Sequence, residues 1–510
     1  MKKLIYILLA IISLTFVSSC SNFEGINTDP NVPTTVSPEM LATQILVNSY
    51  RFWNPNPTDF STGNLWCKHI AILETNPNPY QYYYSYWPYG DFGGLQQITN
   101  LNKMVEAAKG STTQSSFEGL ALFMKASAGF QETLDMGDIP YSEAGMADQG
   151  ITKPKYDKQA DVFVEILADL KAAEEKFAAG TDIGSCDIMY NGDNTKWRKL
   201  CNAMQLKVLQ TMSKHITSDQ KARFAAIVAA GNLMTSNDDN FQLVYSDNPN
   251  AWHPFYNGEG QRIYDGVSKL VVDALKNFHD RRLFYFAEPA QYLIDAGKSE
   301  TDFDAYEGAP TELAADQLAL NNQNGKYSLL NKRYTLISAG DPMIKFTYAE
   351  QCFIIAEAIE EGWVTGNAKD YYENGVKAML TYYMNLPSAQ TGVHNMKIDQ
   401  AYIDGYFTGA AAYATDGTKD DRLHQIWTQR WLIDFFQGNG LNYPQFLRTG
   451  YPQFPLNPAT SMNPDDPTVY PKRWMYPTSE LVTNPDNYKK AVQEQYGGYD
   501  GINKTPWYLQ

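Results

Sequence analysis

Apolar residues recur at helical spacing in a long series of separate stretches. In the clearest of them, Phe117, Leu120 and Met124 fall on one helical face. Ser115 and Glu118 have the spacing of a capping box, which predicts that a helix begins there. Similar stretches cover residues 38–50, 95–109, 157–179, 195–216 and 219–234. A chain patterned in this way is predicted to be all-α.

The C-terminal half carries a helix pair with the spacing of a known repeat. Tyr348, Cys352 and Ile355 mark one face of a helix that Gly362 ends, and a second helix is predicted over 367–384. Together they have about the length of one tetratricopeptide unit. No Ser/Gly or charged linker divides the chain, so we predict stacked tetratricopeptide-like helical hairpins in a single domain.

The N-terminus has the three-part layout of a secretory signal. Lys2 and Lys3 precede an apolar run over 4–17, and small residues then lead to Cys20. The sequence before Cys20 resembles the lipobox at which lipoprotein signal peptidase cuts. We therefore predict a signal peptide over 1–19, a mature domain over 20–510 and lipidation of Cys20. The alternative is a secreted protein without an anchor.

The charge of the chain excludes one class of partner. The formal net charge is −16, and loss of Lys2 and Lys3 with the signal makes it more negative. Basic residues never cluster beyond a pair such as Arg281–Arg282. Nucleic-acid binding needs a basic stripe or patch, so no nucleic-acid partner is expected.

Long segments rich in proline, asparagine and aromatics separate the predicted helices. They cover residues 52–92, 245–264, 280–341 and 450–485. Structureless loops of this length are uncommon in compact domains and are usually functional. We therefore expect a loop-rich ligand-binding face.

One of these loops concentrates aromatic side chains, which can stack on sugar rings. The cluster is Tyr80, Tyr82, Tyr83, Tyr84, Tyr86, Trp87 and Tyr89. We select Tyr82, Tyr84 and Trp87 as ligand contacts, with Asn78 as a polar partner and Gln81 and Asp91 close by. An extended segment points successive side chains to opposite sides, so about half of the cluster is expected to anchor the loop instead.

Two further aromatic groups are weaker candidates. Trp252 and Tyr256 lie in the second loop, and Tyr292 lies in the third, near Tyr285, Phe286 and the arginine pair. For each group a structural role is the simpler interpretation. The C-terminal Trp474, Tyr476, Trp507 and Tyr508 are assigned to packing.

Several motifs together resemble the SusD/RagB family of nutrient-binding lipoproteins, in its second SusD-like branch. The resemblance rests on residues 27–31 (NTDPN), 137–144 (GDIPYSEA), 348–350 (YAE), 356–358 (AEA), 371–376 (YYENGV), 429–432 (QRWL), 473–477 (RWMYP) and 505–508 (TPWY). It spans most of the mature chain in the family's order. One departure is Leu447 where a second arginine is expected, with Asn442 in place of the usual acid.

The resemblance implies a function as well as a fold. It implies a helical body of tetratricopeptide-like hairpins, lipid-anchored in the outer membrane and facing the cell exterior. Such a protein would bind oligosaccharides and deliver them to a SusC-like TonB-dependent transporter. A RagB-like oligopeptide binder is the alternative. No cofactor, no metal and no catalysis come with the family.

Other chemistries remain as weaker interpretations. The sequence lacks a Gly-x-Ser-x-Gly elbow and a His-Glu-x-x-His motif. A helical glycoside hydrolase needs only two carboxylates, so it stays as an alternative. Calcium could bind at 238–240, although a helix cap is the commoner meaning of such a run. Cys67 and Cys186 could pair, which the sequence leaves open.

Overall fold

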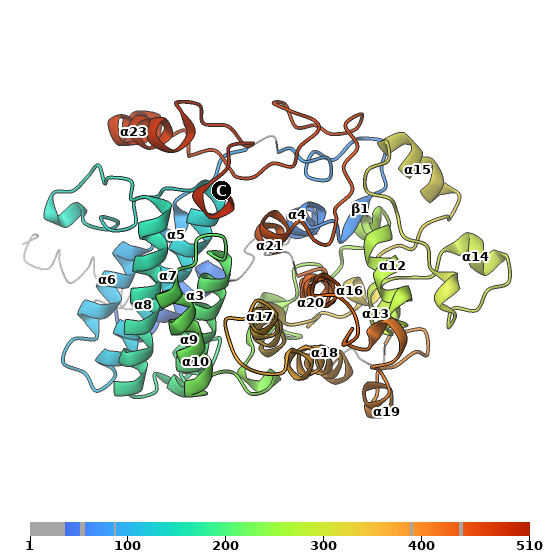
Figure 1. Cartoon of the computed structure of the whole chain (residues 1–510), viewed down its shortest axis with the longest axis horizontal. Helices are drawn as coiled ribbons and strands as arrows, with labels where there is room; N and C mark the ends of the chain where they lie inside the picture. Colours follow the sequence, from blue (N-terminus) through green and yellow to red (C-terminus); the bar gives the residue numbers. More distant parts are fainter. Residues whose placement is uncertain (1–35, 51–56, 86–87, 388–390, 438–441) are drawn as a thin grey trace, which may run out of the picture.

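A computed structural model describes residues 36–50, 57–85, 88–387, 391–437 and 442–510 (Figure 1). The predicted signal, Cys20, the 27–31 motif and Trp87 lie outside these residues. No helix in the described ranges combines the length and the apolar character needed to cross a membrane.

The N-terminal half is a bundle of helices that stand side by side (Figure 1). They are α3 (Pro38–Tyr50), α5 (Gly93–Gln96), α6 (Ile98–Ala107), α7 (Gln114–Met136), α8 (Gln159–Ala179), α9 (Asn194–Thr211) and α10 (Ser218–Ala230), whereas α4 (Pro57–Trp66) lies apart from them, towards the middle of Figure 1. The periodic stretches are therefore confirmed as helices. Helix α10 ends before the predicted boundary because Gly231, at φ 70°, forms a left-handed cap.

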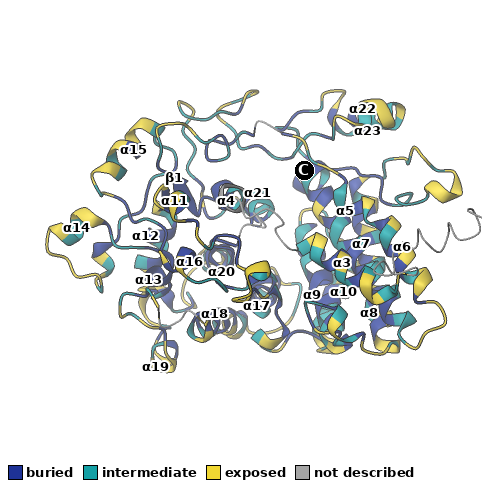
Figure 2. Cartoon of the chain, turned by 180° about the vertical axis from the view of Figure 1, so that it is seen from behind, coloured by how far each residue is buried: buried dark blue, intermediate teal, exposed yellow. Residues whose placement is uncertain are grey.

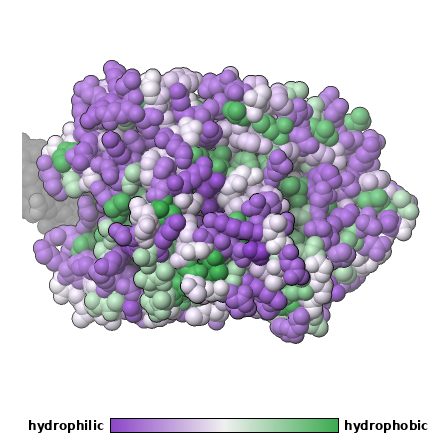
Figure 3. All heavy atoms as spheres, in the orientation of Figure 1, coloured by the Kyte–Doolittle hydropathy of each residue, from purple (hydrophilic) through white to green (hydrophobic). Residues whose placement is uncertain are grey.

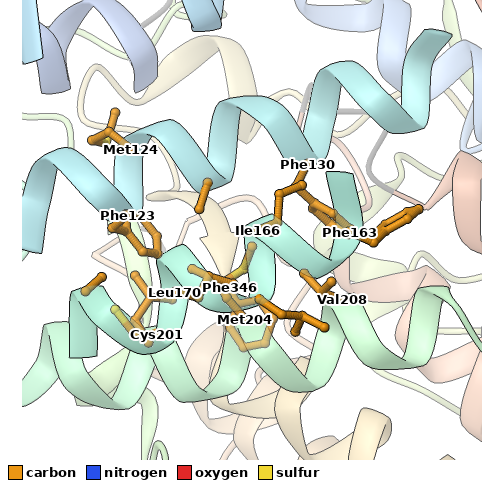
Figure 4. Packing of buried hydrophobic residues seen from close by; sticks show 14 of the residues in the cluster. Phe123, Met124, Phe130, Phe163, Ile166, Leu170, Cys201, Met204, Val208 and Phe346 are labelled. Carbon is orange, nitrogen blue, oxygen red and sulfur yellow. The ribbon is translucent and has the colours of Figure 1, made fainter. Parts of the chain in front are cut away.

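Helices α7, α8 and α9 share one apolar core (Figure 4). Phe123 and Phe130 of α7 and Leu170 of α8 point between the helices, and Phe346 reaches them from the second half. Trp197 of α9 is fully buried and stacks on Phe177 of α8 with ring centroids 5.5 Å apart. The apolar stripe read from the sequence is thus the interface of the hairpins.

The predicted capping box at the start of α7 is wrong. The helix begins at Gln114 after Thr113, which makes no side-chain cap. The Ser115 hydroxyl donates to the carbonyl of Lys176 on α8 at 2.7 Å, and Glu118 pairs with the Lys176 ammonium. Both side chains therefore join neighbouring helices. Capping boxes occur instead on α10, at Thr217, and on α20 (Lys419–Ile433), at Thr418.

The C-terminal half mixes three long helices with many short ones. Its elements are α11 (Glu259–Arg262), α12 (Lys269–Asn277), α13 (Arg282–Phe286), α14 (Gln291–Asp295), α15 (Ala315–Gln323), α16 (Arg333–Leu336), α17 (Tyr348–Glu360), α18 (Ala368–Asn385), α19 (Gln400–Asp404), α20 (Lys419–Ile433), α21 (Tyr443–Thr449), α22 (Glu480–Thr483) and α23 (Pro485–Tyr496). Helix α17 packs on α18 and α20 and also on α9, which joins the two halves.

Two short antiparallel strand pairs complete the fold. Strands β1 (Ile70–Ile72) and β3 (Asp265–Val267) form one pair, and β2 (Phe241–Leu243) and β4 (Met343–Phe346) form the other. All the other regular elements are helical, so the predicted all-α class is confirmed for the described residues.

Buried charges hold the segment 280–341 in place. Arg282 pairs with Asp280 at 2.6 Å, and Arg333 pairs with Asp341 at 2.6 Å. These four side chains are almost completely buried. The segment is therefore an ordered part of the interior (dark blue in Figure 2), whereas its helices α14 and α15 are largely exposed.

The described cysteines Cys67, Cys186, Cys201 and Cys352 are free thiols. In the acidic run 238–240, Asp239 accepts from Lys199 at 2.9 Å and caps the backbone of Thr235. Among the described residues, no group of three or more histidine, cysteine or acidic side chains is arranged to hold a metal ion.

Candidate functional site

The aromatic loop is fixed to the body by some of its own tyrosines. Tyr82 is buried, and its hydroxyl donates to the carbonyl of Leu313 at 2.6 Å. Tyr83 is also buried, and its hydroxyl donates to the carbonyl of Pro455 at 2.8 Å. Both are anchors in this structure. They are consecutive and lie in a turn, with Tyr83 at φ 64°, so the alternation expected of an extended segment does not apply here.

The other selected residues of this loop have different positions. The side-chain oxygen Oδ1 of Asn78 accepts from the backbone N–H of Tyr80 at 2.9 Å, so it shapes a turn. Tyr84 is half-buried. Trp87 lies outside the described residues, and its role as a ligand contact stays a prediction.

A cavity of about 730 Å³ lies beside this loop. Helices α3 and α7 form one wall, the loop and α5 form the rim, and β4 and Trp474 close the far side. Its aromatic lining comes from Tyr50, Tyr80, Tyr89, Phe123, Phe130, Phe241, Phe346 and Trp474. The volume falls within the range typical of ligand pockets, about 300–1,000 Å³.

The backbone on either side of Tyr89 is hydrogen-bonded to the C-terminal segment. It forms an isolated parallel bridge with Met475, whose N–H donates to the carbonyl of Pro88 at 2.8 Å. The N–H of Gly90 returns a bond to the Met475 carbonyl, also at 2.8 Å. The Tyr89 side chain itself is 40% exposed and lines the cavity. Its ring is therefore available to a ligand, while its backbone is anchored.

One wall of the cavity is acidic. Glu132 and Asp135 leave α7 three residues apart, and Asp91 comes from the rim. Burial raises the pKa of the Glu132 carboxyl to about 8 and that of Asp135 to about 7, and the negative charge of Asp91 adds to both shifts. Gln131 donates to both Asp135 carboxylate oxygens at 3.1 Å.

Two lysines, from α9 and β4, also line the cavity. Lys207 pairs with Glu350 at 2.9 Å, so its charge is balanced by a neighbour. Burial lowers the pKa of Lys345 to about 8. The cavity therefore offers aromatic faces, amide and carboxyl groups, and positive charge.

A second cavity of about 320 Å³ adjoins the first. The residues shared by both linings are Thr62, Gln131, Leu134, Asp135, Pro444 and Trp474. Trp66, Tyr443 and Tyr508 add aromatic surface to the second. The pair of cavities gives an extended space along α7.

The remaining candidates lie elsewhere. Trp252 and Tyr256 meet edge to face with centroids 4.9 Å apart, and Trp252 is 38% exposed. Tyr292 is 39% exposed on α14, on the opposite side of the molecule from the bundle (Figure 1). Tyr285 and its neighbour Phe286 are fully buried. None of them lines either cavity.

Sequence reasoning missed Tyr50, Glu132, Asp135 and the cavity position of Trp474. They come from three distant segments, namely α3, α7 and the C-terminal segment, and no local pattern joins them. A usable signal existed only for Glu132, an acid within the otherwise apolar stripe of α7, where it is 6% exposed. Buried acids without a basic neighbour often mark functional sites.

The surface seen in Figure 3 is mostly hydrophilic, with hydrophobic side chains in small separate groups. A tetratricopeptide-like helical scaffold thus carries an aromatic cavity bordered by an ordered loop, an arrangement that suits the binding of a ligand.

The comparisons assign this architecture to a family. The SusD-like_2 family, described as "Starch-binding associating with outer membrane", matches residues 30–477. This chain belongs to that family, which confirms the resemblance seen in the motifs. None of the curated proteins matches the sequence.

Solved structures agree with this assignment. A SusD homologue from Bacteroides fragilis NCTC 9343 is 35% identical with a TM-score of 0.87, and 93% of this chain covers 100% of that one. An outer membrane protein from Bacteroides vulgatus ATCC 8482, described in terms of nutrient binding, is 31% identical with a TM-score of 0.81 over the same coverage. A chitin-binding protein is 25% identical with a TM-score of 0.72, again with 93% and 100% covered.

Proposed function

We propose that the mature chain, starting at a lipidated Cys20, captures oligosaccharides at the cell exterior and delivers them to a SusC-like TonB-dependent transporter. The family's starch-binding description and the chitin-binding relative support a glycan as ligand. The family's association with the outer membrane supports the location. The lipobox-like sequence before Cys20 supports the anchor.

The aromatic cavity is the observation that carries this proposal. Sugar rings present apolar C–H faces that stack on aromatic planes, while their hydroxyls need polar partners. Tyr89 and Trp474 supply aromatic surface, and Gln97 and Gln131 supply amides in the same cavity. An oligopeptide could use the same amides, so it remains the alternative ligand.

Catalysis is not part of the proposal. Glycoside hydrolysis needs two carboxyl groups on either side of the scissile bond. Glu132 and Asp135 instead leave the same face of α7, three residues apart. We expect purified protein to leave maltohexaose and hexa-N-acetylchitohexaose intact. Product that persists through rigorous purification would favour the hydrolase alternative.

The test is calorimetric binding of a hexasaccharide panel (maltohexaose, cellohexaose and hexa-N-acetylchitohexaose) to wild type and three variants. Tyr89→Ala should weaken binding about tenfold to hundredfold, by analogy with other stacking on aromatic side chains. Tyr292→Ala is a matched control, because Tyr292 is equally exposed but remote from the cavity.

Trp252→Ala completes the design. Loss of binding in Trp252→Ala with full binding in Tyr89→Ala would contradict the cavity and favour the Trp252–Tyr256 pair. If no glycan binds but a casein digest does, the oligopeptide alternative replaces the glycan.

The lipid anchor has its own test. Loss of surface labelling of intact cells in Cys20→Ala would support the anchor, whereas unchanged labelling would contradict it.

A further inference from the structure

The acidic wall of the cavity contains an unsatisfied oxygen. Glu132 is 6% exposed, and its Oε1 accepts the backbone N–H of Leu95 at 3.0 Å. Its Oε2 has no hydrogen-bond partner among the described residues, although Glu132 lines the cavity. A buried polar atom without a partner is destabilising. A hydrogen-bond donor that reached this buried oxygen from the cavity would relieve that cost.

Protein cations do not neutralise this wall. None of Asp91, Glu132 and Asp135 forms an ion pair with a described residue. Asp91 accepts the N–H of Gly93 at 2.7 Å, and Asp135 accepts only from the neutral Gln131. The lysines that line the cavity, Lys207 and Lys345, belong to α9 and β4, whereas the three acids lie on α7 and the rim.

Hydrogen bonds within and between α5 and α7 fix the side chains of Glu132 and Asp135. Glu132 holds α5 against α7 through its bond to Leu95, and a Cβ at Gly94 would lie 2.9 Å from its Oε1. Asp135 is fixed by Gln131 one turn earlier on α7. The negative charges of Asp91 and Asp135 add to the raised pKa of Glu132, and that of Asp91 adds to the raised pKa of Asp135, so the carboxyl groups are close enough to interact electrostatically. This wall is therefore a preorganised group of oxygen acceptors that lacks a cation.

We infer that Glu132, with Asp91 and Asp135, binds a protonated primary amine of the ligand. The inference deepens the proposed glycan capture, on which it rests, and names the ligand class as oligosaccharides with free amino groups. An ammonium group supplies three donors and a positive charge, which matches the free Oε2 and its acidic neighbours. The aromatic rings of Tyr89 and Trp474 favour a sugar over a peptide as carrier of the amine.

Proton release is the second consequence of the geometry. In the free protein, burial keeps Glu132 largely protonated near neutral pH, since its pKa is about 8. A bound ammonium favours the ionised carboxylate and displaces that proton. Binding of an amino sugar is therefore linked to release of protons, and binding of an acetylated sugar is not. Asp91 and Asp135 on the same wall, and Lys207 of α9 and Lys345 of β4, are the other charged groups facing the cavity.

The experiment uses two ligands that differ only in acetylation. Calorimetry at pH 6 and 0.15 M salt compares chitosan hexamer with hexa-N-acetylchitohexaose, on the full-length mature protein. Wild type should bind the chitosan hexamer at least about tenfold more tightly, the scale of one charged hydrogen bond. Titrations in two buffers of different ionisation enthalpy should show proton release for this ligand alone.

Glu132→Gln is the decisive variant, because glutamine can still accept from Leu95 but carries no charge. It should lower chitosan affinity about tenfold, abolish most of the proton release and leave the acetylated ligand unaffected. Glu106→Gln removes one exposed acid from α6 and is the matched control, with no change expected. Asp135→Asn provides the same test if Glu132→Gln fails to fold.

The outcomes separate the two proposals. Equal affinity for both hexamers, with a retained effect of Tyr89→Ala, overturns the amine site and leaves glycan capture intact. If another hexasaccharide binds but neither the chitosan hexamer nor hexa-N-acetylchitohexaose does, the amine site is also overturned and glycan capture is left intact. Preference for a lysine-containing peptide that Glu132→Gln abolishes overturns the sugar assignment. Tenfold preference for the amine, lost in Glu132→Gln but not in Glu106→Gln, supports the inference.

Discussion

The bundle of α3 and α5–α10 and the segment 280–341 both form ordered interior, but different chemistry orders them. In the bundle, long helices bury apolar stripes such as that of Leu170 (Figure 4). In the segment, short helices surround buried ion pairs, such as Arg333–Asp341, and the side-chain amide of Asn331 bonds the carbonyl of Phe284 at 2.9 Å. Apolar packing tolerates a change of residue type of similar size, whereas a buried charge does not tolerate loss of its partner.

The largest effect is expected from Arg333→Leu. The Arg333 guanidinium makes two 2.6 Å bonds to Asp341 and donates to the carbonyl of Tyr285 at 2.8 Å. Its loss leaves the Asp341 charge buried and should lower the free energy of unfolding by about 3–5 kcal/mol. Urea denaturation measures this change. Arg198→Leu, at a half-exposed pair with Glu174, is the control, with about 1 kcal/mol or less expected.

The double variant sharpens this comparison. Arg333→Leu with Asp341→Leu removes both charges, so it should be less destabilised than Arg333→Leu alone. If the double variant and Arg333→Leu are destabilised equally, the shape of these side chains, rather than their charge, orders the segment 280–341.

A core truncation in the bundle should have the next largest effect. Leu170→Ala removes a fully buried side chain of α8 and should cost about 2–5 kcal/mol. Val164→Ala on the same helix, where the side chain is 54% exposed, should stay within about 0.5 kcal/mol. Leu170→Met should be nearly neutral. A large loss in Leu170→Met would show that the bundle is as intolerant as the polar segment.

The third prediction concerns pH. Asp265 is fully buried, and burial raises its pKa from 3.8 to about 7. Between these values the folded state holds a proton that the unfolded state has released. Stability therefore falls as pH rises through this window, by at most about 1.4 kcal/mol per pH unit for this group. Asp265→Asn should flatten the dependence of melting temperature on pH between about 4 and 7.

Glu132, Asp135 and Asp434 act in the same direction, since burial raises their pKa values too. The difference between Asp265→Asn and wild type in the pH dependence of melting temperature gives the contribution of Asp265 alone. Asp273→Asn, at an exposed carboxylate paired with Lys269, is the control. A slope that is unchanged in Asp265→Asn would show that this carboxyl is not held protonated.

The smallest effects are expected at the capping boxes. Thr217 caps α10 in the bundle, and Thr418 caps α20 in the other half. Substitution of either by alanine should cost about 1 kcal/mol in urea denaturation. Capping is local, so the two losses should agree despite the different interiors. A several-fold difference would mean that the two halves unfold separately.

Helical periodicity predicted the bundle because each apolar stripe is written in consecutive turns. The bounds of α3 agree with the predicted 38–50. The sequence predicts a loop over 280–341, because periodicity does not reveal partners outside the segment, such as Gln429 for Arg282 and Gly392 for Asn331. Side-chain hydrogen bonds between distant residues leave no local pattern in a sequence.

The candidate site shows the same limit. The sequence located the loop that borders the cavity, but Tyr82 proved to be an anchor and Tyr89 faces the cavity. Which side chains of the loop face the body depends on the turn at 79–83 and on distant partners, here Leu313 and Met475. The acids of α7 could not be assigned to a site before the cavity was known.

The central claim is that ligand binds in the aromatic cavity along α7. The most direct measurement is a crystal structure with the hexasaccharide that binds most tightly in the calorimetric panel. The account predicts sugar density in contact with the rings of Tyr89 and Trp474, with its polar groups directed at α7. Sugar density at the Trp252–Tyr256 pair, with the cavity filled only by solvent, would contradict it.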